Sequence, residues 1–131
     1  IGNSGRTMNP YLVQEIRGPD LSILQTTEPT QFEDALKPSN SLSLTEMLVN
    51  VVENGTGSNA QIAGVRVAGK TGTAQTGNDS PSVAWFISFA PAAAPKVAVA
   101  VVIEESGLAE VSGNGLAAPI AKEVMKAVLG S

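Results

Sequence analysis

The stretch Val67-Ala68-Gly69-Lys70-Thr71-Gly72-Thr73-Ala74-Gln75 carries most of the chemical information in this sequence of 131 residues. One lysine lies among small and hydroxyl-bearing residues, and its glycines leave the backbone uncovered. On a strand, such a segment presents an ammonium group, several hydrogen-bond donors and an open backbone edge on one surface. We therefore expect a β-strand that receives an anion or a peptide.

Two further strands are expected after it. The first strand should run from Val65 to Gln75, and the others from Val83 to Ala90 and from Val97 to Glu104. Their connectors, residues 77–81 and 91–95, hold Gly, Asn, Asp, Ser and Pro or an Ala-Pro run and are too short for helical crossovers. The sequence therefore predicts an antiparallel sheet.

Amphipathic helices are expected before and after this sheet. Ser43 and Glu46 have the spacing of a capping box, and Gly55 is placed to end the helix in the left-handed conformation. Its apolar face is predicted to hold Leu44, Met47, Leu48, Val51 and Val52. A final helix should span Leu116 to Leu129 and close at Gly130. Its apolar positions are Ile120, Val124 and Val128 and also Ala121, Met125 and Leu129.

The first 42 residues have a weaker pattern. Tyr11 to Arg17 and Leu21 to Thr26 flank the turn formers Gly18-Pro19-Asp20, which predicts a hairpin. Thr27 to Asn40 is polar and contains prolines, so we expect a loop with one short helical turn. The predicted fold is α+β: a hairpin and loop region at 1–42, then a helix, an antiparallel sheet and a C-terminal helix at 43–131.

Composition excludes several classes of function. With 43% hydrophobic and 15% charged residues, the chain has the make-up of one globular domain. The net charge of −4 and the scattered basic residues argue against a nucleic-acid partner. Without Cys or His, any chemistry must use Lys, Ser, Thr, Asp or Glu. The chain opens with Ile1 in a stretch that reads like the end of an earlier element, so we expect it to be part of something longer.

One alternative is a phosphate-binding loop. Gly64 to Thr71 satisfies the pattern G-x-x-x-x-G-K-[ST], which needs a helix that begins at its end. Gly72, Gly77 and Pro81 follow instead and cannot open that helix, so we interpret the match as coincidental.

The K-T-G triplet is one of the signatures of penicillin-binding proteins and serine β-lactamases. The sequence resembles the transpeptidase domain of penicillin-binding proteins, clearly over residues 43–131 and more weakly over 1–42. It is most similar to the monofunctional class B enzymes, of the actinobacterial penicillin-binding protein A type. The segments that carry the resemblance are residues 67–75, Ala84-Trp85-Phe86-Ile87-Ser88-Phe89-Ala90-Pro91 and Ala117-Ala118-Pro119-Ile120. Upstream, Gly55-Thr56-Gly57 and Met8-Asn9-Pro10-Tyr11-Leu12 are also similar to the family.

Three departures from the family pattern stand out. Ser88 occupies a position where the family usually has glycine, and we expect the strand to tolerate it. No Ser is followed three residues later by Lys, so the nucleophilic serine and its lysine are expected outside these residues. Ser112-Gly113-Asn114 has the form of the family's second motif but follows the K-T-G triplet instead of preceding it, and we interpret it as coincidental.

The resemblance implies roles for individual residues. Lys70 holds positive charge near the attacking serine and draws in the substrate carboxylate, although a merely solvated strand lysine is the alternative. Thr73 lends its backbone N–H to the oxyanion hole and its hydroxyl to the carboxylate. Gly72 leaves room for substrate along the strand, and Thr71 and Gln75 support the site. Trp85, by contrast, is expected in the core.

The implied function is that of a serine D,D-transpeptidase that cross-links peptidoglycan. Its partners would be a stem peptide ending in D-Ala-D-Ala, β-lactams that mimic it, and the N-terminal portion of the same domain. No metal and no organic cofactor are implied. The expected location is the outer face of the cytoplasmic membrane, with an anchor absent from this chain. A non-catalytic, penicillin-recognising sensor module is the second reading left open.

Overall fold

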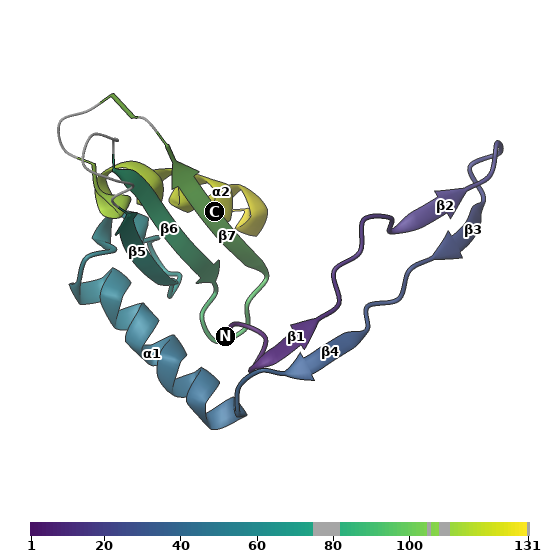
Figure 1. Cartoon of the computed structure of the whole chain (residues 1–131), viewed down its shortest axis with the longest axis horizontal. Coiled ribbons are helices and arrows are strands. Elements are labelled where there is room, and N and C mark those ends of the chain that lie inside the picture. Colours follow the sequence, from purple (N-terminus) through teal and green to yellow (C-terminus); the bar gives the residue numbers. More distant parts are fainter. Residues whose placement is uncertain (75–81, 105, 108–110, 131) are drawn as a thin grey trace.

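The structure, a computed structural model, describes residues 1–74, 82–104, 106–107 and 111–130. It consists of a body, in which helices pack on a three-stranded sheet, and a thin two-part ribbon that extends away from it (Figure 1). The K-T-G segment lies in the body.

The sheet contains β5 (Ala68–Ala74), β6 (Val83–Ala90) and β7 (Val97–Ile103) in the order β5-β6-β7. Both pairings are antiparallel and in continuous register, with Lys70 opposite Ile87. The predicted antiparallel sheet is therefore confirmed. Among the described strands, β5 pairs with β6 alone, so it is an edge strand.

The two faces of the sheet differ in what covers them. Phe86 and Ala84 are fully buried on one face, because side chains alternate along a strand and this set points toward helix α2 (Ala118–Leu129). Along β7, Val97, Val99, Val101 and Ile103 pack against the same core.

The opposite face is covered at one end, where Phe89 is buried against Ala68 and against Val49 of the helix at Pro38–Asn54, and is open beyond that in the described part of the chain. Trp85 is 42% exposed and Ile87 is 49% exposed, while Ala98, Ala100 and Val102 of β7 are exposed beside them. The prediction that Trp85 lies in the core is therefore wrong, because Trp85 alternates with Phe86 and points away from α2. Along β7, the described residues cover only alternate side chains.

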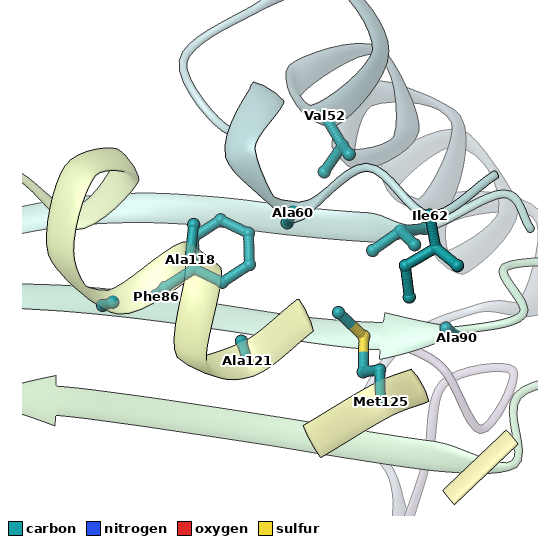
Figure 2. Close-up of a cluster of buried hydrophobic side chains, with 10 residues drawn as sticks. Val52, Ala60, Ile62, Phe86, Ala90, Ala118, Ala121 and Met125 are labelled. Atoms are coloured by element: carbon teal, nitrogen blue, oxygen red, sulfur yellow. The ribbon is translucent and has the colours of Figure 1, made fainter. Parts of the chain in front are cut away.

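The core lies between the sheet, α1, α2 and the short turn η1 (Ser58–Ala60), as Figure 2 shows. Phe86 comes from the sheet, Val52 from α1 (Pro38–Asn54), and Ala121 and Met125 from α2. All four side chains are 1% exposed or less. α2 is therefore fixed on the rear of β6 and β7, next to the strand that carries the K-T-G segment.

Helix α1 differs from its predicted bounds. It begins at Pro38 and not at Ser43, because proline is favoured in the first helical turn, and Ser43 Oγ donates to the carbonyl of Ser39 inside the helix. The predicted capping box is therefore wrong. Gly55 follows the helix with a φ of −128°, so the predicted left-handed end is wrong as well.

The buried face of α1 is also rotated from the prediction. Ser41, Thr45, Val49 and Val52 are buried, whereas Met47 is 63% exposed. Small polar residues occupy the first turns of the buried face, and Thr45 satisfies its hydroxyl by donating to the Ser41 carbonyl. The predicted face is therefore partly confirmed: Val52 is buried and Leu44, Leu48 and Val51 are half-buried, while Met47 is on the exposed side.

α2 follows η2, a π-helical turn over Gly113–Ala117. Gly130 closes α2 in the left-handed conformation with a φ of 73°, as the sequence predicts. Of the two apolar stripes expected, only the one with Ala121 and Met125 is buried, and Ile120, Val124 and Val128 are exposed.

The N-terminal ribbon contains two strand pairs. β1 (Arg6–Met8) pairs with β4 (Gln31–Asp34), and β2 (Glu15–Arg17) pairs with β3 (Ile23–Thr26), both antiparallel. The predicted hairpin is confirmed with shorter strands. The predicted loop at 27–40 is wrong, because it contains β4 and the start of α1. None of the helices in the described residues has the length and hydropathy of a membrane span.

Candidate active site

β5 presents the K-T-G residues on an edge of the sheet. Lys70 and Gly72 lie on the open face, opposite Ile87 and Trp85, while Thr71 and Thr73 alternate to the other face. Lys70 and Thr73 are exposed, and Thr71 and Gly72 are half-buried. All four lie side by side on one strand. Gln75, the fifth predicted site residue, lies outside the described residues.

The ammonium group of Lys70 folds back along its own strand. Nζ donates to the Thr71 carbonyl at 2.8 Å and lies 3.5 Å from the Thr71 hydroxyl. Backbone groups of residues two apart on a strand point to the same side. The N–H of Thr73 therefore lies on the same side of β5 as the carbonyl that binds Lys70.

Thr56 is a neighbour of the site that the sequence analysis does not assign. Its hydroxyl lies 3.0 Å from the hydroxyl of Thr71, and either group can donate. Thr56 follows α1 and is separated from Thr71 by 15 residues, so no local spacing joins the two. The contact links the end of α1 to the middle of β5 and holds the Thr71 hydroxyl beside Lys70.

An ion-pair cluster ties the entry of β5 to α1. Arg66 Nη2 lies 2.9 Å from Glu46 Oε2, and Arg66 Nε lies 3.5 Å from Glu53 Oε1. The hydrogen bond from Arg66, and then its charge, lower the pKa of the Glu46 carboxyl, and the same contacts raise the pKa of Arg66. These side chains are exposed, so the cluster contributes to orientation more than to stability.

Ser112-Gly113-Asn114 lies on the rear of the sheet. Ser112 Oγ accepts from the Gly115 N–H, and Asn114 Oδ1 accepts from the Asn59 N–H, both at 3.0 Å. The side chains of Ser112 and Asn114 are therefore used in hydrogen bonds within this turn and to η1.

The phosphate-loop alternative is excluded by the geometry of β5. The chain continues as a strand through Gly72 to Ala74, where that motif needs the first turn of a helix. Among the described residues, no group of three or more His, Cys, Asp or Glu side chains is placed to hold a metal ion.

Known proteins resemble this chain over most of its length. The family model for the penicillin binding protein transpeptidase domain matches residues 1–126. Among curated relatives, the chain is 45% identical to peptidoglycan D,D-transpeptidase PbpA of Mycolicibacterium smegmatis, over 98% of this chain and 27% of the relative. PbpA of Mycobacterium tuberculosis matches with the same identity and coverage. The chain thus spans about a quarter of the length of these relatives.

Solved structures agree with this result. The ceftriaxone acyl-enzyme complex of penicillin-binding protein A from M. tuberculosis matches with a TM-score of 0.90 and 45% identity, over 98% of this chain and 29% of that structure. The D,D-transpeptidase domain of a peptidoglycan glycosyltransferase from Eggerthella lenta matches with a TM-score of 0.86 and 36% identity, over 98% of this chain and 29% of that structure. An edge strand carrying K-T-G, the matching family model and these two structural likenesses lead to one conclusion: the chain belongs to the penicillin-binding-protein transpeptidase family.

Proposed function

We propose that this chain forms one wall of the active site of a serine D,D-transpeptidase that cross-links peptidoglycan stem peptides and is acylated by β-lactams. The observation that carries the proposal is the edge strand β5, on which Lys70, Gly72 and Thr73 stand beside one another. The relatives named peptidoglycan D,D-transpeptidase and the β-lactam acyl-enzyme structures support the same activity.

In this proposal the nucleophilic serine and its lysine come from the N-terminal portion of the same domain. No Ser-x-x-Lys spacing occurs in these residues, which supports that assignment. The serine oxygen attacks the carbonyl carbon of the scissile amide and passes its proton, through the base, to the departing amine. The carbonyl oxygen carries negative charge in between, and the acyl-enzyme is the product of the step.

β5 stabilises that charge and holds the substrate. The N–H of Thr73, on the same side of β5 as the Thr71 carbonyl that binds Lys70, donates to the developing oxyanion, where a preorganised donor is most effective. Lys70 supplies positive charge for the C-terminal carboxylate of the stem peptide or the carboxylate of a β-lactam. Thr71 and Gln75 support these contacts.

The free edge of β5 is the surface along which the peptide lies. An extended peptide can add to an unpaired strand edge through backbone hydrogen bonds. Gly72 keeps the strand bare at the centre of this edge. A side chain there would begin 3.2 Å from Cβ of Trp85 and would stand on the same face as Lys70.

The proposed partners are the stem peptide ending in D-Ala-D-Ala, β-lactams and the N-terminal portion of the domain, with no nucleic acid. A peptidoglycan substrate places this activity on the outer face of the cytoplasmic membrane. The anchor in the proposal is a segment absent from this chain.

Lys70→Ala tests this function in the transpeptidase that contains this chain and the N-terminal portion. We expect the rate of acylation by penicillin to fall by about 10² to 10³, because an oriented charge is lost from the site. Lys96→Ala, in the exposed turn between β6 and β7, is the matched control and should keep the parent rate. Stopped-flow acylation and thermal melts measure both effects. A Lys70→Ala protein that acylates within twofold of the parent would contradict the proposal.

A further inference from the structure

Ser112-Gly113-Asn114 lies against the backbone of the K-T-G strand. A Cβ atom on Gly113 would lie 2.2 Å from the Trp85 carbonyl oxygen, and 3.0 Å and 3.1 Å from the oxygen and nitrogen of Gly72. Gly72 and Trp85 are register partners in β5 and β6. The backbone of Gly113 therefore touches the sheet at the very pair that carries the centre of the K-T-G segment.

The turn that holds Gly113 is fixed on its other sides. The Asn59 amide nitrogen donates to Asn114 Oδ1, and Asn59 Nδ2 donates to the Asn114 carbonyl, both at 3.0 Å. Asn114 Nδ2 also donates to Ser58 Oγ at 3.4 Å. Ser112 Oγ caps the turn from within by accepting from the Gly115 N–H. Hydrogen bonds to η1 thus hold the turn in place.

The turn is also held in place at its C-terminal end. It leads directly into α2, whose first residue Ala118 is fully buried, as is Ala117 before it. β5, by contrast, is an edge strand with a single described partner. The shortest approach is to Trp85 in β6, so an added Cβ presses first on β6, and β5 shifts with it because Gly72 is the register partner of Trp85.

We propose that Gly113 is a positioning residue for transpeptidation: its bare Cα sets how far β5 lies from the rear of the sheet, and through Gly72 it sets the placement of Lys70 and Thr73. This inference rests on the proposed function, because it assigns Gly113 an effect on catalysis through those two residues. Ser-x-Asn in this position is therefore a support behind the site and takes no part in the chemistry. A side chain at Gly113 shifts the β5-β6 pair at Gly72 and Trp85, and with it Lys70 and Thr73.

The test measures β-lactam acylation in the transpeptidase that contains this chain and the N-terminal portion. Gly113→Ala is compared with Gly115→Ala, the matched control two residues on, where the new Cβ would lie 3.0 Å from the end of the Ser112 side chain and, among the described residues, meets no backbone of the sheet. Stopped-flow traces over a range of penicillin concentrations give the limiting acylation rate and the pre-covalent Kd separately. Titration of reactive sites gives the folded fraction.

We expect Gly113→Ala to lower the limiting acylation rate of the folded fraction by on the order of 10²-fold, the effect of a displacement near 1 Å at a reacting centre. Gly115→Ala should stay within about twofold of the parent rate. A purely structural role predicts something different: fewer folded molecules, each reacting at the parent rate. That result would overturn the proposal.

Asn114→Ala provides the second variant if Gly113→Ala does not fold. It releases the turn from η1 without adding an atom beside Gly72, and we expect about a tenfold lower limiting rate in folded protein. A parent rate in that variant, or failure of both variants to fold, would overturn the positioning role. Lys70→Ala separates the two claims: if it acylates normally, the proposed function fails, and if it alone is slow, only the role of Gly113 fails.

Discussion

At the scale of single residues, Thr73 combines two functions in the proposed site. Its backbone N–H is proposed as an oxyanion donor, and its hydroxyl as a contact for the substrate carboxylate. The two can be separated by mutation, because a side-chain change leaves the N–H in place. Thr73 is exposed on β5, so its hydroxyl can be removed without disturbing the core.

Thr73→Val should therefore weaken carboxylate recognition without abolishing acylation. We expect the pre-covalent Kd for penicillin to rise by about tenfold, since one hydrogen bond to a charged group is worth about 1.5 kcal/mol, and the limiting rate to fall less. Concentration-dependent acylation kinetics resolve the two constants. An unchanged Kd would remove the hydroxyl from the site, whereas complete loss of reaction would indicate a distorted strand.

Ser88, which stands where the family usually has glycine, is a buried residue in the middle of the sheet. It lies opposite Gly69 in β5, is only 6% exposed, and its hydroxyl has no hydrogen-bond partner among the described residues. A buried hydroxyl without a partner is destabilising. The sequence correctly indicates that the strand survives serine at this position, and β6 is continuous through it.

Ser88→Ala should stabilise the protein by about 1 kcal/mol, because it removes the buried hydroxyl and keeps the Cβ. Ser43→Ala, on the solvent-exposed side of α1, serves as the control and should change the free energy of unfolding by less than about 0.5 kcal/mol. Denaturant unfolding measures both. A clear loss of stability in Ser88→Ala would show that the hydroxyl is hydrogen-bonded in the folded protein.

At the scale of elements, α2 supports the sheet from the face opposite Lys70. Met125 is fully buried between α2 and the sheet, in the cluster that also contains Phe86 (Figure 2). Because Phe86 is opposite Thr71 in β5, this packing reaches the K-T-G segment from the rear. The helix thus supports the strand while leaving its edge and its opposite face open.

Met125→Ala should lower the free energy of unfolding by about 2 to 5 kcal/mol, since it leaves a cavity in the core. Val128→Ala, one turn further on the exposed stripe, should lower it by less than about 1 kcal/mol. Calorimetry or denaturant unfolding of the two variants makes the comparison. Equal losses would mean that both stripes of α2 are buried in the complete protein.

How well each element could be predicted depended on what specifies it. β6 was predicted with its observed bounds, because an aromatic and β-branched run lies between turn formers. β4, Gln31–Asp34, could not be, since its sequence favours no strand and it forms by pairing with β1. The start of α1 differs for another reason: Ser43 and Glu46 have the spacing of a capping box, and this pattern competes with Pro38, although proline is typical of a first helical turn.

In the candidate site too, local sequence pattern predicts some residues, and others approach only through tertiary packing. Lys70 to Thr73 were predicted as neighbours because they share one strand and carry a recognisable motif. Thr56 and Gly113 were not, because they reach β5 from a loop and a turn that lie far along the chain. Local pattern indicates the chemistry, and tertiary packing decides what surrounds it.

At the scale of the whole molecule, the body is covered unevenly. α2 packs on one face of the sheet (Figure 1). The other face exposes Ile87 opposite Lys70, Trp85 beside it, and Val102 opposite Trp85. Burying such side chains is worth about 1.5 to 3 kcal/mol each, so a covering segment would be strongly favoured. We propose that the N-terminal portion of the domain covers this face and brings the nucleophilic serine to the edge of β5.

Mapping the penicillin adduct tests this arrangement most directly. The transpeptidase that contains this chain is acylated with penicillin and digested, and the modified peptide is located by mass spectrometry. We expect the adduct to lie on a serine of the N-terminal portion, and Lys70→Ala to slow its formation without changing its position. An adduct on any serine within residues 1–131 would contradict the claim that this chain supplies a wall of the active site and not its nucleophile.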